Sequence, residues 1–299
     1  MLSFLPKPLI GILNIAFHVV NLLVCSIMVY ILAFFKLFSW GNLGIKIFDK
    51  LGSWMAIIFT FNNFWFMLLT TRMRYDIRGG EQLSHKEWYL LMSNHQSWAD
   101  ILVLERVFAF RIPMLKFMLK KELIWVPLVG TSCWALNFPF MKRYTSAFVA
   151  KNPHLKGQDL ATTRKACERF QHIPATMINF VEGTRFTKEK HTKQQSPYQH
   201  LLKPKAGGIA FILDAMGKTL TNILDVTIVY PPSKHLAWDY FCGRLNHIIV
   251  DIKTLPVSEN LIGDYQDDAG FKTQFQAWIN QLWQQKDQRI SALKAELND

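Results

Sequence analysis

The sequence is poor in cysteine and in charged residues. Its four cysteines, Cys25, Cys133, Cys167 and Cys242, match neither a zinc-ligand spacing nor a disulfide framework. This excludes a disulfide-stapled secreted scaffold and favours a reduced, cytoplasmic body. Charged residues make up 19% of the chain, hydrophobic residues make up 50%, and the mean hydropathy is +0.09. Such a composition excludes intrinsic disorder.

Acidic residues are scarce mainly in the middle third of the chain. Residues 111–205 carry 17 Lys and Arg against 5 Asp and Glu, and the formal net charge of the whole chain is +12. A confined excess of this kind predicts a surface that meets phosphates, anionic lipid or nucleic acid; a solvated face is the alternative. Because this segment lacks a recognisable nucleic-acid-binding motif, nucleic acid is not expected as a partner.

Charged residues are absent from two N-terminal runs, residues 9–35 (27 residues) and residues 51–71 (21 residues). About 20 apolar residues suffice to cross a bilayer, so residues 1–71 are predicted to form a membrane-anchoring helical hairpin. The first run is too long for the apolar part of a signal peptide, and no small-residue cleavage site follows it. Two alternatives stay open: a hairpin that enters only one leaflet, and core helices of a soluble protein.

A few polar side chains interrupt these two runs. They are Asn14, His18, Asn21, Asn62 and Asn63. Unpaired polar groups are costly in lipid, which favours hydrogen bonds between the two helices or a place near the interface. We therefore expect the two helices to pair through these residues.

Residues 72–299 read as alternating strands and helices. Strands are predicted at 73–77, 88–92, 133–138, 176–181, 224–230 and 247–252, and helices at 98–108, 157–170 and 208–216. The predicted fold class is α/β, a single sheet with flanking helices, preceded by the N-terminal membrane helical hairpin. Residues 271–297 form an amphipathic pattern, so a C-terminal helix is expected to pack on the body or, as the alternative, on lipid.

A histidine and an aspartate follow the strand at 88–92. His95 and Asp100 are five residues apart, so they cannot meet on one continuous helix. They meet only if His95 lies in a turn and Asp100 lies in the first turn of the next helix. In that geometry the carboxylate fixes the imidazole tautomer, and the other ring nitrogen can take a proton from a hydroxyl. The alternative is a surface turn in which Asp100 caps the helix.

Cationic side chains follow two other predicted strands. Glu182-Gly183-Thr184-Arg185 follows the strand at 176–181, and Lys142-Arg143 follows the strand at 133–138. We expect these strand ends to converge near His95 at the carboxyl edge of one sheet, where arginine would bind phosphate. Lys205, just before a helix, is a further candidate for anion contact. Ordinary turns with solvated cations are the alternative.

Lysines dominate the loop at 186–205. This loop is expected to meet acidic headgroups, the phosphates of coenzyme A or the acidic surface of an acyl carrier protein, unless it is merely solvated. His191 and His200 in it form no metal-ligand pattern with cysteine or with each other, so no metal site is expected.

Four blocks together resemble the PlsC-type glycerolipid acyltransferases, the 1-acylglycerol-3-phosphate O-acyltransferase family. The resemblance covers about residues 88–231, and its wording looks closest to the YihG-type bacterial branch and also to some eukaryotic lysophosphatidate acyltransferases. The blocks are Asn94-His95-x4-Asp100, Phe140-x-x-Arg143, Phe180-Val181-Glu182-Gly183-Thr184-Arg185 and Val226-Thr227-Ile228-Val229-Tyr230-Pro231.

The resemblance implies acyl transfer from acyl-CoA or acyl carrier protein to the sn-2 hydroxyl of 1-acyl-glycerol-3-phosphate, forming phosphatidate. His95 would be the general base and Asp100 its orienting partner, with no metal and no resident cofactor. The expected partners are a lysophospholipid acceptor, an acyl donor and membrane lipids. The predicted substrate-binding residues are Asn94, Lys142, Arg143, Glu182, Gly183, Thr184, Arg185 and Lys205.

The expected location is the inner membrane of a bacterium, with the catalytic body facing the cytoplasm. Two other functions stay open. One is acyl transfer to another lysophospholipid, such as lysocardiolipin, with the same His/Asp pair. The other is a non-catalytic, membrane-tethered anion-binding protein.

Overall fold

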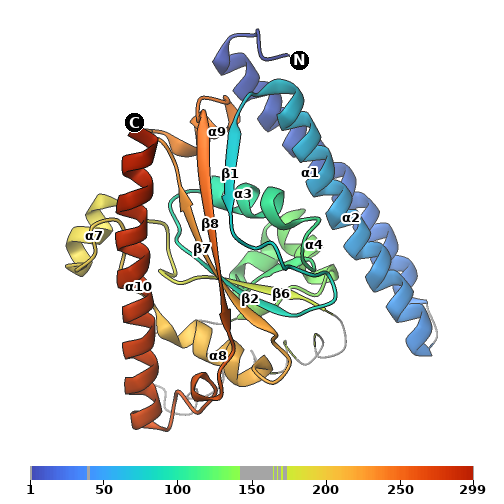
Figure 1. Ribbon diagram of the computed structural model, residues 1–299. Coiled ribbons are helices and arrows are strands. Elements are labelled where there is room, and N and C mark those ends of the chain that lie inside the picture. Colours follow the sequence, from blue (N-terminus) through green and yellow to red (C-terminus); the bar gives the residue numbers. More distant parts are fainter. Residues whose placement is uncertain are drawn as a thin grey trace.

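Two apolar helices form a hairpin along one side of an α/β body (Figure 1). The computed structural model describes residues 2–38, 41–141, 164, 167, 170 and 174–298. Helix α1 spans Lys7–Leu37 and helix α2 spans Gly41–Thr70. By length and composition, Lys7–Leu37 and Ile47–Thr70 are apolar enough to cross a membrane. The two uncharged runs of the sequence therefore form the two helices of the predicted hairpin.

A six-stranded mixed sheet forms the centre of the body. The strand order is β1-β8-β7-β2-β6-β3, and all neighbours are parallel except the antiparallel pair β7 and β8. The strands are β1 (Arg74–Arg78), β2 (Tyr89–Ser93), β3 (Leu115–Phe117), β6 (Thr176–Phe180), β7 (Asn222–Val229) and β8 (His247–Pro256). Two short strands, β4 (Leu119–Lys120) and β5 (Phe140–Met141), pair separately.

Helices cover both faces of the sheet, as an α/β fold requires. One hydrophobic cluster joins the sheet to α8 (Ala206–Met216) and α10 (Ala269–Asn298). The other joins it to α3 (Ala99–Phe108) and α9 (Leu236–Phe241). The remaining described helices are η1 (Lys121–Trp125), α4 (Val129–Ala135), α7 (Lys188–Gln194) and η3 (Glu259–Leu261).

The predicted α/β class is confirmed, and so is the packing of the C-terminal helix on the body. Side chains along one face of α10, including Phe275, Trp283 and Leu293, are buried in the core. The strand predicted at 133–138 is wrong, because α4 ends at Ala135 and only Phe140–Met141 is extended, outside the main sheet. A short apolar run has no periodicity that separates a strand from a helix.

Two further differences concern the middle of the chain. Strand β3 was not predicted, because three residues are too few to show an alternating pattern. The helix predicted at 157–170 lies outside the described residues except at positions 164, 167 and 170.

Amide side chains join the two helices of the hairpin, as predicted. Asn21 donates through Nδ2 to Oδ1 of Asn63 at 2.9 Å, and Asn62 donates to Oδ1 of Asn21 at 3.1 Å. Near the other end, the Thr70 hydroxyl donates to Oδ1 of Asn14 at 2.9 Å. The four asparagines of the apolar runs therefore make the predicted contacts between the helices. His18 does not, because its Nδ1 bonds to the Asn14 carbonyl within α1 at 2.8 Å.

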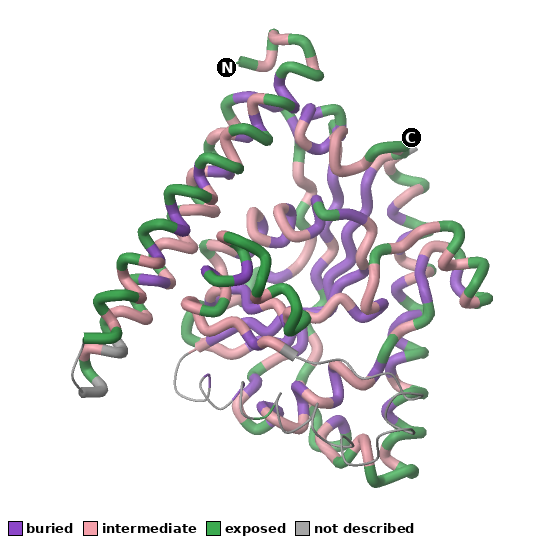
Figure 2. Tube along the Cα trace, turned by 180° about the vertical axis from the view of Figure 1, so that it is seen from behind, coloured by how far each residue is buried: buried purple, intermediate pink, exposed green. Residues whose placement is uncertain are grey.

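The hairpin also contacts the body along its length. Asn14 donates to the Phe241 carbonyl in α9 at 2.8 Å, and the Tyr30 hydroxyl donates to the Leu128 carbonyl before α4 at 3.4 Å. At the far end, Asn137 donates to Asp49 at 3.1 Å. Exposed residues recur along both helices of the hairpin (Figure 2), and many of them are large and apolar. They include Ile12, Val20, Leu23, Ile27, Phe34, Trp54, Phe61, Trp65 and Leu69.

Candidate active site

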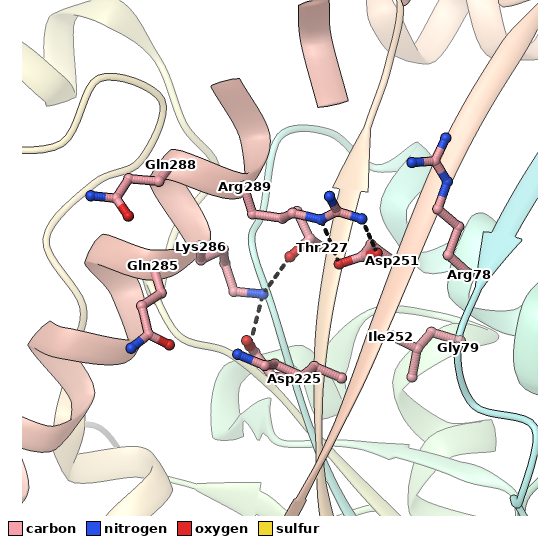
Figure 3. A pocket seen from close by; sticks show the side chains of 11 residues that line it. Arg78, Gly79, Asp225, Thr227, Asp251, Ile252, Gln285, Lys286, Gln288 and Arg289 are labelled. Carbon is pink, nitrogen blue, oxygen red and sulfur yellow. Dashed lines mark hydrogen bonds and ion pairs between the residues drawn. The ribbon is translucent and has the colours of Figure 1, made fainter. Parts of the chain in front are cut away.

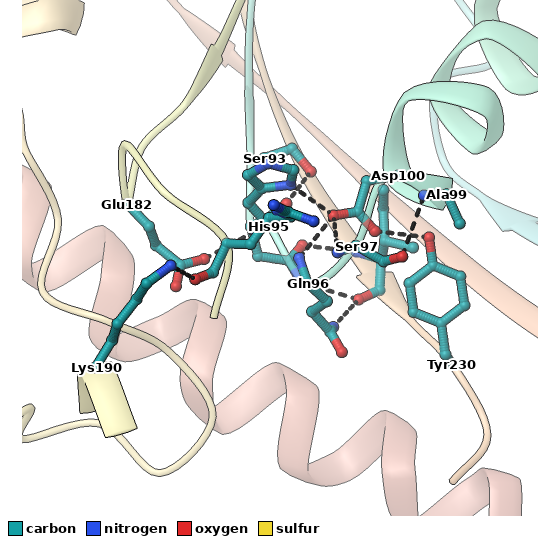
Figure 4. A network of polar contacts seen from close by, with 12 residues as sticks. Ser93, His95, Gln96, Ser97, Ala99, Asp100, Glu182, Lys190 and Tyr230 are labelled. Atoms are coloured by element: carbon teal, nitrogen blue, oxygen red, sulfur yellow. Dashed lines mark hydrogen bonds and ion pairs between the residues drawn. The ribbon is translucent and has the colours of Figure 1, made fainter. Parts of the chain in front are cut away.

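His95 and Asp100 meet in the geometry that the sequence predicts (Figure 4). His95 follows β2, and Asp100 lies in the first turn of α3. Nδ1 of His95 lies 2.8 Å from Oδ2 of Asp100. The contact selects the tautomer in which Nδ1 carries the proton, which leaves Nε2 as the basic nitrogen.

The Asp100 carboxylate is buried and receives further hydrogen bonds. The backbone N–H groups of Gln96 and Ser97 donate to Oδ2 at 2.6 and 2.9 Å, and the Tyr230 hydroxyl donates to Oδ1 at 2.7 Å. Burial and the neighbouring Asp100 charge raise the pKa of Tyr230 well above its ordinary value. Tyr230 therefore keeps its proton and remains a donor to Asp100 throughout the physiological pH range.

The imidazole of His95 lies against an aromatic ring and retains some access to solvent. Its ring stacks on Phe180 at a centroid distance of 4.0 Å, and its side chain is 14% exposed. Within the described part of the chain, Nε2 has no hydrogen-bond partner. A held ring with an unoccupied basic nitrogen has the geometry of a general base.

The Glu182 carboxylate binds the backbone of the turn that carries His95. Oε1 accepts the His95 backbone N–H at 2.8 Å, and Oε2 accepts the Leu202 backbone N–H at 2.9 Å. Its side chain is fully buried, and burial raises the pKa of its carboxyl to about 7 against the two hydrogen bonds. Both carboxylate oxygens thus contact the protein backbone. The predicted contact of Glu182 with substrate stays a prediction.

Asn94 fixes the same turn to β7. Its Nδ2 donates to the Ile228 carbonyl at 3.0 Å, and its Oδ1 accepts the Ile228 N–H at 2.9 Å. The buried amide thus continues the hydrogen bonding between β2 and β7 beyond Ser93, the last residue of β2. The structure places Asn94 as a positioning residue, and the predicted substrate contact is untested.

The segment after β6 brings its glycine and cations beside the turn. Gly183 has a φ of +67°, a conformation that favours glycine, and a Cβ there would lie 2.9 Å from Cδ of Lys205. Arg185 stacks on Trp98, next to α3, with its guanidinium carbon 4.8 Å from the ring centroid. Lys205 and Arg185 are exposed at this edge of the sheet. The Phe186 backbone N–H donates to the His95 carbonyl at 2.7 Å, so the end of β6 lies beside the His95 turn, as predicted for this strand end.

A lysine of the 186–205 loop that is not part of the family motif blocks contacts the 182–185 segment. Lys190 Nζ, in α7, donates to the Thr184 hydroxyl at 2.8 Å and to the Arg185 carbonyl at 3.0 Å. Lys190 therefore supports the conformation of the segment that carries Arg185.

Lys142 and Arg143 lie outside the described residues, so their predicted phosphate contacts stay predictions. Tyr230, in contrast, was missed as a site residue although it stands in the fourth motif block. Its position at the carboxyl end of β7, an edge where ligands bind in α/β sheets, is the signal that could have found it.

A cavity of about 770 Å³ lies away from this turn, between α10 and strands β7 and β8 (Figure 3). Its charged lining is largely paired within the protein. Lys286 Nζ lies 2.8 Å from Asp225 Oδ1, and Arg289 lies 2.7 Å from Asp251 Oδ1. We therefore place the candidate active site at His95 rather than in this cavity. Among the described residues, no group of three or more His, Cys, Asp or Glu side chains is arranged to hold a metal ion.

A carboxylate-bound histidine that keeps some access to solvent at the edge of an α/β sheet has the geometry of a base for a hydroxyl group. Residues 74–231 match the family model described as Acyltransferase, which covers more than half of the chain. The chain therefore belongs to the acyltransferase family. Its relatives are of the PlsC-type glycerolipid branch, as the motif blocks predicted.

Two curated relatives illustrate this. The chain is 28% identical over 189 residues to 1-acyl-sn-glycerol-3-phosphate acyltransferase 3 of Arabidopsis thaliana, a match that covers 58% of this chain and 46% of the relative. It is 25% identical over 183 residues to 1-acyl-sn-glycerol-3-phosphate acyltransferase gamma of Mus musculus, covering 58% and 44%. The matched part spans about half the length of these relatives.

A solved structure shares the fold. The crystal structure of the 1-acyl-sn-glycerophosphate acyltransferase PlsC from Thermotoga maritima aligns with a TM-score of 0.51 and 16% identity, covering 95% of this chain and 98% of that chain. The alignment therefore extends over almost the whole chain. The assignment to the YihG-type branch stays a prediction.

Proposed function

We propose that this acyltransferase moves an acyl group from an acyl thioester to the sn-2 hydroxyl of 1-acyl-glycerol-3-phosphate and forms phosphatidate. The observation that carries the proposal is the His95–Asp100 contact of 2.8 Å, with Nε2 left for the substrate. A glycerol hydroxyl is a poor nucleophile at neutral pH, so its proton must leave as it attacks. The family match and the curated relatives support this choice of acceptor.

The proposed reaction needs one base. Nε2 of His95 takes the proton of the sn-2 hydroxyl while its oxygen attacks the thioester carbonyl carbon. The tetrahedral intermediate then collapses, the carbon–sulfur bond breaks, and the imidazolium returns the proton to the leaving thiolate. Asp100 holds the ring and stabilises the imidazolium, and Tyr230 and the two backbone N–H groups hold Asp100. The thioester is already activated, so no covalent acyl-enzyme is required.

The acceptor phosphate would lie against the cations at this edge. Arg185 and Lys205 are exposed beside the turn, and Lys142 and Arg143 are proposed to join them. A phosphomonoester carries close to two negative charges, and an arginine fork binds it through paired hydrogen bonds. The donor is proposed to be acyl-CoA or acyl carrier protein.

The hairpin is proposed to enter one leaflet of the membrane. Its inner side contacts the body from Asn14 to Asp49. If it crossed the bilayer, it would carry the polar body into the hydrocarbon, where polar groups are costly. We propose that the membrane is the inner membrane of a bacterium and that the body faces the cytoplasm.

A panel of acyl donors and lysophospholipid acceptors on the purified full chain, read by mass spectrometry, tests the function. We expect phosphatidate from lysophosphatidate, and no product with His95→Ala in folded protein. Retained activity in that variant would overturn the role of His95. Lysocardiolipin as the better acceptor would replace the proposed substrate, and no activity with any lysolipid would favour an anion-binding role.

The phosphate contact has its own test. Because Arg185 is exposed beside the turn, Arg185→Ala should raise the acceptor KM about tenfold while the donor KM changes little. Lys188→Ala, in the exposed first turn of α7, is the matched control for the loss of a positive charge. Equal effects on both KM values would contradict the assignment.

A further inference from the structure

The C-terminal helix α10 contacts the loop that supports Glu182. The Trp283 indole N–H donates to the Leu202 carbonyl at 3.0 Å, and the Trp283 side chain is fully buried. The N–H of Leu202, on the other side of that residue, donates to Glu182. Because both contacts are made by the backbone of Leu202, the position of Glu182 depends on where α10 holds this residue.

A second contact lies one turn further along α10. The Asp287 carboxylate accepts the backbone N–H groups of Gln199 and His200 at 2.8 and 2.7 Å, one on each oxygen. One turn before Trp283, the Asn280 carbonyl accepts the Tyr198 hydroxyl at 3.4 Å. Residues 198–202 are thus attached to three successive turns of one helix. We call residues 198–202 the support loop.

The contacts form a continuous chain from α10 to the catalytic turn. Asp287 and Trp283 hold the support loop, Leu202 of that loop binds one oxygen of Glu182, and the other oxygen binds the N–H of His95. The Glu182 side chain is fully buried, and each of its oxygens accepts one of these two backbone N–H groups. A movement of the support loop would therefore be transmitted to the backbone of His95.

We propose that Asp287 and Trp283 are positioning residues for the catalytic base, acting through the support loop and Glu182. The inference rests on the proposed role of His95. Neither residue touches the reacting groups, and both lie more than fifty residues beyond the last block of the family motifs. A displacement of about 1 Å in a reacting group is enough to slow catalysis by orders of magnitude.

Asp287→Asn and Trp283→Phe test the proposal in the full chain. In Asp287→Asn the side chain keeps one acceptor oxygen, and its amide N–H group faces the other backbone N–H, which loses its acceptor. In Trp283→Phe the indole N–H that donates to Leu202 is lost. We expect about a tenfold fall in kcat, with the KM of both substrates within about twofold of wild type. A merely structural loss would lower the amount of folded enzyme without this separation of kcat from KM.

Hydrogen exchange provides a readout that does not need substrate. Because the His95 amide is bound to Glu182, we expect it and its neighbours at 94–98 to exchange faster in both variants. Arg289→Gln is the matched control, since it removes an ion pair of the same helix with Asp251 and touches neither the support loop nor Glu182. It should leave exchange at 94–98 and kcat unchanged.

A double variant tests the route. If Asp287 acts through Glu182, then Glu182→Gln combined with Asp287→Asn should be no slower than Glu182→Gln alone. Additive losses, or unchanged exchange at 94–98 in both folded single variants, would overturn the proposal. If wild-type enzyme acylates no lysolipid, the proposed function fails, and hydrogen exchange still decides whether α10 positions the turn.

Discussion

The hairpin and the catalytic turn both bury polar side chains, but they bury different kinds. The hairpin uses neutral amides, such as Asn21 and Asn63, which bond mainly to each other and to carbonyl groups. The turn uses two carboxylates, Asp100 and Glu182, and surrounds each with backbone N–H donors. A buried charge is expensive unless several donors compensate for it. The hairpin therefore uses polarity for pairing, and the turn uses it to fix one histidine.

The largest effect is expected at the orienting carboxylate. Asp100→Asn places an amide N–H against the donors of Gln96 and Ser97 and disfavours the tautomer with a basic Nε2. We expect kcat to fall about a thousandfold to ten-thousandfold, measured as phosphatidate formation by purified enzyme. Asp251→Asn, which breaks a surface ion pair, is the control. If Asp100→Asn kept activity close to wild type, a buried carboxylate would not be needed to orient His95. The contrast between the carboxylates of the turn and the amides of the hairpin would then be wrong.

The second carboxylate should make stability depend on pH. Burial raises the pKa of Glu182 from 4.5 to about 7, so the folded state binds a proton more tightly than the unfolded state. Its stabilising contribution is full below about pH 4.5 and is lost as the pH rises through 7. At 1.36 kcal/mol per unit, the change is at most about 3 kcal/mol. The unfolding free energy of Glu182→Gln, measured with denaturant at several pH values, should lack this pH dependence. If the variant and the wild type depended on pH equally, the raised pKa of Glu182 would be contradicted.

A smaller effect is expected when the charged acceptor loses a single donor. Tyr230→Phe removes the hydroxyl that donates to Oδ1 of Asp100, and we expect a loss of about 2 kcal/mol in unfolding free energy and a lower kcat. Tyr75→Phe is the matched control, because the Tyr75 hydroxyl donates to the neutral hydroxyl of Tyr240 at 3.1 Å. The control should lose about half as much. Equal losses would show that the charge on Asp100 adds nothing to the contact.

The hairpin should give the smallest effect. Asn21→Leu removes the hydrogen bonds to Asn63, Asn62 and the Phe59 carbonyl, yet interhelical contacts of this kind contribute only about 1 kcal/mol. Thermal unfolding in detergent micelles should show a small decrease, and kcat should stay at the wild-type value. Val24→Leu, at an exposed position of α1, serves as the control. A large loss of kcat in Asn21→Leu would mean that the hairpin also positions the turn.

Local sequence was sufficient for one half of the site and insufficient for the other. The His95–Asp100 contact is encoded within six residues, and the strand before it and the helix after it have clear patterns. Tyr230 lies 130 residues from Asp100, and the backbone of His95 is held by Glu182, 87 residues away. Such partners depend on the order of strands in the sheet, which a pattern of apolar residues does not specify. The false strand at 133–138 has a different cause, because a short apolar run does not distinguish a strand from a helix.

The contacts at the base of the hairpin bear on how the chain is made. Asn14 bonds to Phe241, 227 residues later, and Gly11 packs against Cys242 and Trp238. At about 5 to 20 residues per second, a ribosome needs on the order of ten to forty seconds to reach these partners. During that time the inner side of α1 lacks the surface it finally covers. A nascent hairpin that waits in lipid would be protected from aggregation, so membrane contact would precede the folding of the body.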